Sequence, residues 1–212
     1  MKRAGPTTGA SAGIVLLHGR GGSADDILGL LAHADVPQVA AIAPEAQGRS
    51  WWPTSFLAPS AQMEPHLAPA LTSVAQAIAT LEAEGIARDR IWLAGFSQGA
   101  CLAAEAYARM GQGLAGLLAF SGALVGTADA ASAPSQGLYG HAPKRFDYSG
   151  TLTGKVWLSV HEQDPHIPLA RVRESANTFT ALGASVETRI HPGAGHGLMQ
   201  DDLAALQSRL SR

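Results

Sequence analysis

The stretch 91–100, with the sequence IWLAGFSQGA, decides the fold. It begins as an apolar run, turns at a serine that lies between two glycines, and continues into a segment of small residues. Gly95 and Gly99 leave room for a sharp bend, with Ser97 at its apex and the amide of Gln98 directly after it. A strand, a tight turn and a helix form a nucleophile elbow, which exposes a hydroxyl at the carboxyl end of the strand. We therefore predict a strand over residues 91–94 and a thin helix over residues 98–110.

The G-x-S-x-G pattern is weak evidence by itself, because the chain contains it twice. The second copy, at residues 9–13, has no strand before it and leads into a strand rather than a helix. Ser11 is therefore interpreted as part of a flexible terminus. The elbow interpretation depends on whether the rest of the chain supplies partners for Ser97.

Composition narrows the class of protein. The chain has 212 residues, 46% of them hydrophobic and 15% charged, with a formal net charge of −2. These values favour one large domain over residues 1–212 and give no sign of nucleic-acid binding or of attraction to an anionic membrane. No apolar run is long enough for a signal peptide or a membrane span, so a cytoplasmic location is expected. The single cysteine, Cys101, excludes an internal disulfide and is expected to be a buried packing residue.

Apolar runs and helical periodicity alternate along the chain. Short apolar runs predict strands over residues 12–17, 39–43, 91–94, 114–120, 155–160 and 185–190. One helical pattern follows Ser23, and a second has His66 in its first turn, apolar residues from Leu67 to Leu81 and its end near Gly85. Further helical patterns span residues 98–110 and 168–183 and cover the last turns up to Leu210. The alternation predicts an α/β fold with a mostly parallel sheet flanked by helices on both faces.

Two segments lack a clear period. Residues 44–64 are irregular and hold Trp51, Trp52 and Phe56, which are candidate substrate-binding residues in the wall of an apolar pocket. The same segment could instead fold a small core of its own over the sheet, and one segment can do both. Residues 122–150 form a long stretch that is often functional in a compact domain, and we expect it to border the site.

The glycine-rich loop that starts at Gly19 has two interpretations. Residues 19–24 fit the dinucleotide pattern G-x-G-x-x-A between a strand and a helix, with Glu45 as the ribose-binding acid. Alternatively, the loop offers a backbone amide to an oxyanion opposite the elbow. The nucleotide interpretation leaves Ser97 unexplained, so we prefer the second.

A serine nucleophile needs a base and an orienting acid, which follow it in the order Ser, acid, His in this type of fold. Asp164 follows the strand at 155–160, and His196 follows the strand at 185–190, between two glycines that let it turn inward. We therefore predict a triad of Ser97, Asp164 and His196. The rival base is His191, and the rival acids are Glu162, Asp147 and Asp201.

The loop after residue 160 also resembles a metal site, because it holds His161, Glu162, Asp164 and His166. The zinc motif H-E-x-x-H needs its histidines one helical turn apart on a helix. Here they are five residues apart around a proline, so no metal and no other cofactor is expected.

Taken together, these pieces resemble the phospholipase/carboxylesterase group of α/β-hydrolases, which includes the acyl-protein thioesterases. The resemblance rests on Leu17-His18-Gly19, Ser50-Trp51-Trp52, Gly95-Phe96-Ser97-Gln98-Gly99, Asp164-Pro165 with Pro168, and Gly195-His196-Gly197. It implies the same triad and an oxyanion hole made by the backbone N–H groups of Arg20 and Gln98. The sheet is expected to be reduced at the N-terminus, since two leading strands have no room. Arg20 and His161 depart from the family, which usually has a small apolar residue or leucine at the first position and glycine at the second.

The leading hypothesis is a serine hydrolase that cleaves carboxylic esters or thioesters of small to medium acyl groups through an acyl-enzyme. Its partner would be a small-molecule ester, with the chain acting as a monomer or homodimer. The alternatives are a lactone hydrolase of the dienelactone type, a binding protein on the same fold, and a nucleotide-dependent oxidoreductase. Arg20 and Arg49 could favour a nearby anionic group on the substrate.

Overall fold

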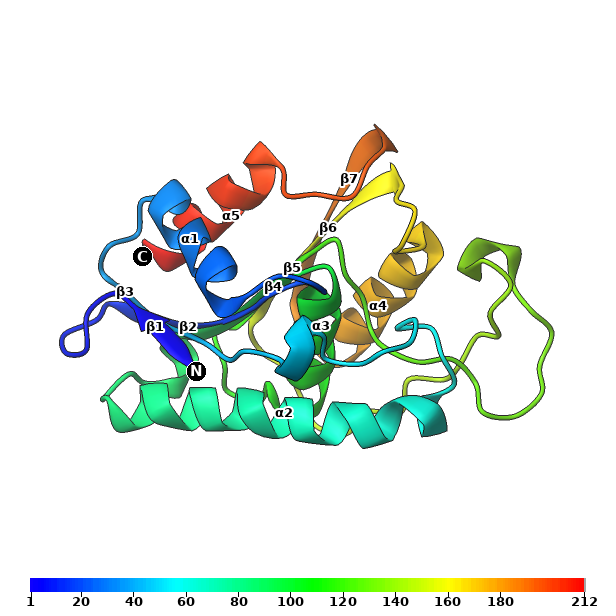
Figure 1. Cartoon of the computed structure of the whole chain (residues 1–212), viewed down its shortest axis with the longest axis horizontal. Coiled ribbons are helices and arrows are strands. Elements are labelled where there is room, and N and C mark those ends of the chain that lie inside the picture. Colours follow the sequence, from blue (N-terminus) through cyan, green and yellow to red (C-terminus); the bar gives the residue numbers. More distant parts are fainter. Residues whose placement is uncertain (212) are drawn as a thin grey trace.

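The computed structural model describes residues 1–211 and contains a seven-stranded sheet in the order β1-β3-β2-β4-β5-β6-β7 (Figure 1). Every neighbouring pair is parallel except β1 with β3, which is antiparallel. The strands are β1 (Lys2–Ala4), β2 (Ala12–Leu17), β3 (Val39–Ala43), β4 (Ile91–Phe96), β5 (Gly116–Phe120), β6 (Lys155–Gln163) and β7 (Ser185–Ala194). The mostly parallel α/β fold predicted from the sequence is therefore confirmed.

Helices cover both faces of the sheet. They are α1 (Ala24–Ala34), α2 (Ser60–Ala83), α3 (Gln98–Met110), α4 (Leu169–Ala181) and α5 (Gln200–Leu210), with short 3₁₀ turns η1 (Gln47–Arg49), η2 (Arg88–Arg90) and η3 (Gln136–Leu138). Helices α2, α3 and α4 pack in one apolar cluster with the sheet, while α1 and α5 pack in a second one on the opposite face. No helix among residues 1–211 is both long and apolar enough to cross a bilayer.

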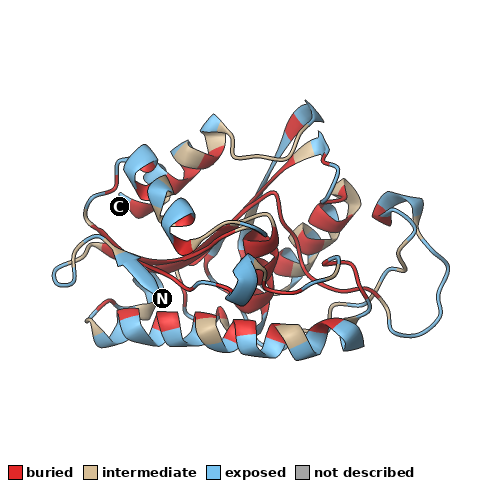
Figure 2. Ribbon diagram, in the orientation of Figure 1, coloured by how far each residue is buried: buried red, intermediate tan, exposed pale blue. Residues whose placement is uncertain are grey.

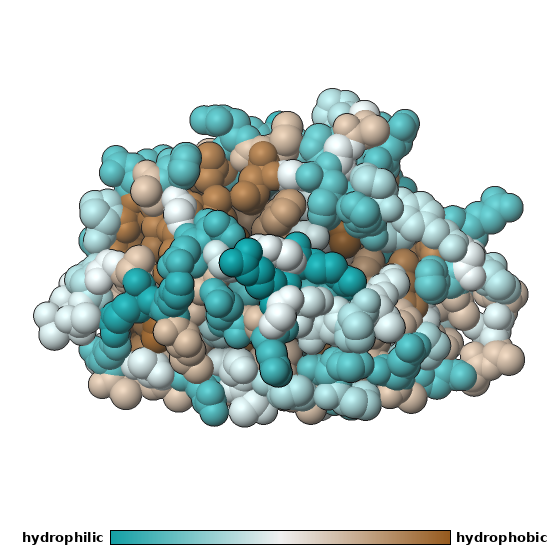
Figure 3. Space-filling view, viewed as in Figure 1, coloured by the Kyte–Doolittle hydropathy of each residue, from teal (hydrophilic) through white to brown (hydrophobic). Residues whose placement is uncertain are grey.

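The central strands bury both of their faces, which explains their continuous apolar sequences (Figure 2). In β2, Val15 and Leu17 belong to the cluster under α2 and α3, whereas Ile14 and Leu16 belong to the cluster under α1 and α5. Alternation along a strand thus divides each apolar run between two cores. The face shown in Figure 3 is mostly hydrophilic, with apolar colour gathered around α1 and α5, the two helices that pack on the second cluster.

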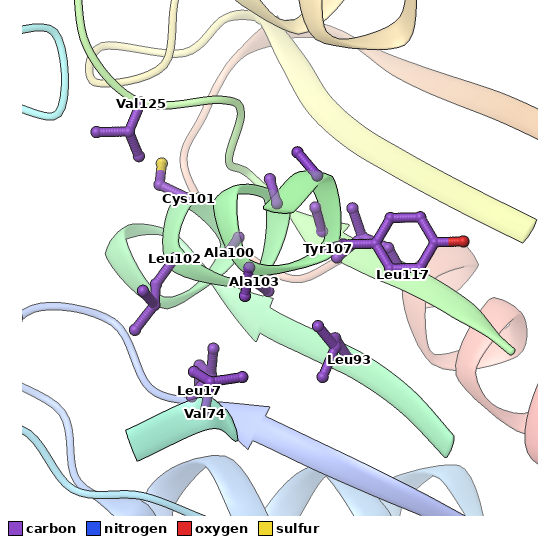
Figure 4. Packing of buried hydrophobic residues seen from close by; sticks show 14 of the residues in the cluster. Leu17, Val74, Leu93, Ala100, Cys101, Leu102, Ala103, Tyr107, Leu117 and Val125 are labelled. Atoms are coloured by element: carbon purple, nitrogen blue, oxygen red, sulfur yellow. The ribbon is translucent and has the colours of Figure 1, made fainter. Parts of the chain in front are cut away.

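Helix α3 lies close to the sheet because its first residues are small. A Cβ added to Gly99 would lie 2.0 Å from the carbonyl oxygen of Leu17, so only glycine permits this approach. Figure 4 shows Ala103 directed toward the strand that carries Leu93. The close packing holds the amino end of α3 against the carboxyl ends of β2 and β4.

The structure corrects the predicted N-terminus. Residues 2–4 form β1, which pairs with β3 at the sheet edge, although no strand was expected before residue 12. The sheet therefore keeps one of the two leading strands that were expected to be absent. Three residues with two charges carry no strand periodicity, so only the pairing with β3 reveals the strand.

The structure also corrects the start of the second helix. Helix α2 begins at Ser60, within the segment 44–64 that was predicted to be irregular, and it contains Pro65 and Pro69. Proline removes a helix hydrogen bond and argues against a helix in the sequence. Burial of Met63 and Leu67 in the core outweighs this loss.

The long segment 122–150 is fixed by two buried charged side chains. The carboxylate of Glu105 accepts hydrogen bonds from the Val125 N–H at 3.2 Å and the Tyr148 hydroxyl at 2.8 Å. The guanidinium of Arg171 donates to the carbonyls of Leu124 and Gly126 at 3.0 and 2.6 Å. A buried charge is costly unless it has hydrogen-bond partners. Glu105 and Arg171 therefore each favour the backbone path of this segment that supplies those partners.

Candidate active site

Three loops at the carboxyl ends of β4, β6 and β7 bring Ser97, Asp164 and His196 together. The Oγ atom of Ser97 lies 2.8 Å from Nε2 of His196, and Nδ1 of His196 lies 2.8 Å from Oδ2 of Asp164. Each of the three residues follows its strand by one or two positions. Because parallel strands end at the same edge of a sheet, residues 32 to 99 positions apart in sequence meet in one constellation.

The backbone at Ser97 is strained, with φ 54° and ψ −119°. A non-glycine residue at positive φ costs about 1–3 kcal/mol, and it persists only where its surroundings hold it in place. Here the Ser97 N–H donates to the Phe120 carbonyl at 2.9 Å, and the Ser97 carbonyl accepts from the Cys101 N–H at 3.0 Å. A Cβ on Gly95 would lie 2.4 Å from the Gly99 carbonyl oxygen, so the turn also requires glycine there.

The carboxylate of Asp164 is buried and fully bonded. Its Oδ1 accepts the backbone N–H groups of His166 at 2.8 Å and Ile167 at 3.0 Å, while Oδ2 faces His196. Burial by itself raises the pKa of this carboxyl, but the hydrogen bonds from His196 and the two amides outweigh it and hold the pKa below its usual value. Asp164 is therefore ionised at neutral pH and orients the imidazole.

This geometry selects one tautomer of His196. With an ionised carboxylate at Nδ1, that nitrogen carries the proton, and the unprotonated Nε2 accepts from the Ser97 hydroxyl. The ring also packs against Phe96 at 5.2 Å and edge-on against His166 at 4.8 Å between centroids. Two ring contacts thus help to hold the imidazole of His196 in place.

The structure does not bring the rival residues to Ser97. His191 is buried within β7 and its ring lies 5.5 Å from that of His161. Asp201 pairs with Arg189 at 2.6 Å, Asp147 lies 3.8 Å from Arg145, and Glu162 is exposed on β6.

The four residues considered as a metal site, His161, Glu162, Asp164 and His166, do not converge. The ring of His161 lies against that of His191, whereas the ring of His166 lies against that of His196. Among residues 1–211, no group of three His, Cys, Asp or Glu side chains is arranged to hold a metal.

Two backbone amides lie beside the serine. Gln98 is the first residue of α3, so its N–H belongs to the positive end of the helix dipole. Arg20 lies in the loop after β2, next to Gly19, where an added Cβ would be 3.4 Å from the Ser97 Cβ. Neither amide has a hydrogen-bond acceptor in the described part of the chain.

The N-terminus of α1, which follows the glycine-rich loop, has few free amides for a phosphate. Glu45 accepts the Ala24 N–H at 2.9 Å, and Ser23 and Asp26 form a capping box at the same helix end. A carboxylate and two caps occupy the amides that a dinucleotide would use. This arrangement opposes the nucleotide interpretation.

A cleft of about 560 Å³ opens at the serine. Trp52 and Phe56 line it, together with Phe96, His166 and Ile167. Trp51 does not: its Nε1 donates to the His18 carbonyl at 2.9 Å, and its ring packs on that of His18 at 5.1 Å. Residues 44–64, here called the aromatic segment, thus form part of the cleft wall and also pack into a small core of their own. These are the two roles that the sequence left open.

Sequence reasoning missed several cleft residues. His166 comes two positions after the acid, and this spacing could have placed it at the site. The side chain of Gln98 had no signal: its Oε1 accepts the Trp51 N–H at 2.9 Å, and its Nε2 donates to the Trp52 carbonyl at 2.8 Å. These contacts join residues almost fifty positions apart, and no local pattern encodes them.

Comparison with known proteins agrees with this geometry. The family model for phospholipase/carboxylesterase matches residues 4–212. The chain belongs to the phospholipase/carboxylesterase family. The search of curated proteins returned no match.

Solved structures extend the likeness over the whole chain. A phospholipase/carboxylesterase from Dyadobacter fermentans is 34% identical, with a TM-score of 0.86, covering 100% of this chain and 95% of that one. Esterase PE8 is 26% identical, with a TM-score of 0.71 and coverage of 100% and 99%. A Bacillus cereus carboxylesterase, at 17% identity, shares the fold with a TM-score of 0.73 and coverage of 99% and 92%. The α/β-hydrolase fold is confirmed, and the family model, together with the Dyadobacter fermentans protein and esterase PE8, supports a hydrolase of the carboxylesterase type.

Proposed function

We propose that the chain is a serine hydrolase that cleaves carboxylic esters or thioesters through an acyl-enzyme on Ser97. The observation that carries the proposal is the continuous hydrogen-bond relay from Ser97 through His196 to Asp164, with both distances at 2.8 Å. A serine hydroxyl is barely nucleophilic at neutral pH, and such a relay supplies the base it needs.

In the first half of the reaction, His196 Nε2 takes the proton of Ser97 as Oγ attacks the acyl carbon. Asp164 holds the imidazole in the required tautomer and stabilises its charged form. The N–H groups of Arg20 and Gln98 bind the developing oxyanion, each contributing about 3 kcal/mol by analogy with other oxyanion holes. Protonated His196 then gives its proton to the leaving alcohol or thiol.

In the second half, His196 removes a proton from water, which attacks the acyl carbon of the acyl-enzyme. The C–O bond to Ser97 breaks, the serine regains its proton, and the carboxylic acid leaves. All atoms come from the ester, water and these side chains, so the step needs no cofactor. Trp52 and Phe56 line the cleft and suit small to medium acyl groups.

The test is hydrolysis of p-nitrophenyl esters, from acetate to palmitate, by wild type and Ser97→Ala. We expect the variant to lose turnover by about 10⁶-fold. A fluorophosphonate probe should label the wild type on Ser97 and leave Ser97→Ala unlabelled. Most activity retained in Ser97→Ala would contradict the proposal. Labelling without ester turnover would redirect it to lactones of the dienelactone type, and neither labelling nor turnover would favour a binding protein.

A further inference from the structure

The cleft is lined by one formally charged side chain, that of Arg20. Within the described residues, no aspartate, glutamate or lysine is among its lining residues. The other side chains there with polar atoms belong to Trp52, Thr54, Ser55, Ser97, Gln98, Cys101, His166 and His196. Asp164 is buried behind His196 and has its own partners. The wall of the cleft therefore presents a cation to a bound molecule without a compensating anion.

The guanidinium of Arg20 is held in position but not neutralised. It donates to the carbonyl oxygen of Pro53 at 3.0 Å and to that of Thr54. A guanidinium has five N–H donors, so three remain available. Within residues 1–211, no carboxylate lies within ion-pair distance of it.

The position of Arg20 in the cleft supports the same interpretation as its charge. The backbone N–H of Arg20 is one of the two amides proposed to bind the oxyanion, so its side chain starts next to the reacting carbon. Pro53 and Thr54, which hold the guanidinium, line the same cleft. A group bound by the guanidinium would thus share one cleft with the ester that Ser97 attacks.

We propose that this cleft selects esters that carry a carboxylate group, bound by the guanidinium of Arg20. A planar guanidinium matches a carboxylate with two parallel N–H···O bonds, and such charge-assisted bonds are stronger than bonds between neutral groups. The inference rests on the proposed function of Ser97, and it adds the substrate class.

Arg20 has a simpler structural role that the test must separate. Its bonds to Pro53 and Thr54 tie the glycine loop to the aromatic segment, and losing them would disturb the cleft for every ester. That disturbance would lower the rates for neutral and acidic esters alike. The informative quantity is therefore the ratio of the two rates within each variant.

The experiment uses two matched pairs of esters, each with a carboxylate and its methyl ester. The carboxylate lies on the acyl side in 4-nitrophenyl hydrogen adipate, paired with methyl 4-nitrophenyl adipate. It lies on the alcohol side in 4-acetoxybenzoate, paired with methyl 4-acetoxybenzoate. For each pair we would measure kcat/KM with wild type, Arg20→Met, Arg20→Lys and Arg49→Met. Arg49 is the matched control, because it is exposed nearby but does not line the cleft.

We expect wild type to prefer the carboxylate in at least one pair by about tenfold, the value of one charge-assisted contact. Arg20→Met should bring that ratio to one or below, Arg20→Lys should keep part of it, and Arg49→Met should leave it unchanged. Raising the salt concentration should shrink the wild-type ratio. No carboxylate preference in either pair, or a preference that survives in Arg20→Met, would overturn the inference while neutral ester turnover leaves the proposed function intact. If wild type neither hydrolyses any ester nor reacts with the probe at Ser97, both the inference about Arg20 and the proposed function would be overturned.

Discussion

The side chain of Gln98 holds the backbone of Trp51. Oε1 of Gln98 accepts the Trp51 N–H at 2.9 Å, and Nε2 donates to the next carbonyl, that of Trp52, at 2.8 Å. The residue that follows the serine therefore fixes the aromatic wall of the cleft with its side chain, while its amide faces the proposed oxyanion. One residue couples the position of the wall to the position of the elbow.

Replacing this side chain should loosen the wall. In Gln98→Leu the Trp51 N–H loses its partner, while the Trp52 carbonyl keeps only the Ser50 hydroxyl, which donates to it at 2.7 Å. A buried polar group without a partner costs about 1–3 kcal/mol. We expect kcat/KM for p-nitrophenyl butyrate to fall about tenfold, mainly through a higher KM, because the backbone amide of the residue remains. Gln76→Leu, on the exposed face of α2, is the matched control. Wild-type kinetics in Gln98→Leu would show that the wall keeps its place without the side chain.

The residue before His196 has no room for a side chain. A Cβ on Gly195 would lie 2.8 Å from Cε1 and Nε2 of His161, whose ring fills the space beneath the loop. Gly195→Ala should therefore displace His196 and lower kcat at least tenfold, measured with p-nitrophenyl acetate. His161→Gly should relieve the clash, so the double variant should recover activity relative to Gly195→Ala. Equal rates for the single and double variants would mean that the ring of His161 is not what restricts the loop.

Cys101 should be inert in the folded protein. It is fully buried one turn after Ser97, and burial raises the pKa of its thiol to about 12. At pH 8 the thiolate fraction is then on the order of 1 in 10⁴, so a disulfide reagent that reports free thiols should not react until denaturant is added. Ser97→Cys provides the positive control, because it places a thiol in the open cleft beside His196. Rapid reaction of native wild type would contradict the burial of Cys101.

Acid should destabilise the fold below about pH 4. Hydrogen bonds hold the pKa values of four carboxyls below their usual range. Asp26 is bonded to Ser23, Glu64 to Arg109 and Glu84 to Arg3. Burial raises the pKa of Asp164, but its hydrogen bonds from His196 and two backbone amides outweigh that effect. As the pH falls past the ordinary carboxyl value of about 4, the unfolded chain binds protons that the folded chain refuses. The free energy of unfolding must then decrease, and the contribution is lost once the pH drops through the folded values.

Urea unfolding at pH 7, 5, 4 and 3 measures this loss. Asp164→Asn removes one of the four carboxyls, so its stability should depend less on pH below pH 4 than that of wild type. Asp89→Asn, at an exposed position, should follow the wild-type curve. Stability that stays constant from pH 5 to pH 3 would contradict the assignment of these carboxyls.

Most of the architecture could be predicted from local sequence. The apolar runs placed the strands that became β2 and β3 at residues 12–17 and 39–43, with the same bounds. The small residues after Ser97 predicted a helix at 98–110 lying close to the sheet, as observed. Periodicity and glycine spacing carry this information because they reflect the strand or helix itself and the face that it buries.

Strand ends were less predictable than strand centres. Strands β6 and β7 run on to Gln163 and Ala194, beyond the expected ends at residues 160 and 190. In these extensions the two strands pair mainly with each other, across a register shift between His161 and Gln163. The pairing is a property of two segments, so neither sequence shows it.

The sequence by itself determined the elbow, the order of Ser97, Asp164 and His196 along the chain, and the alternation that makes their loops share one edge of the sheet. Only the tertiary structure decided which groups meet across that edge: Gln98 with Trp51, Arg20 with the carbonyls of Pro53 and Thr54, and His161 beneath Gly195. Local patterns specify backbone conformation and burial, because both depend on near neighbours. Contacts between distant loops depend on how the whole sheet aligns them, and that alignment exists only after the chain has folded.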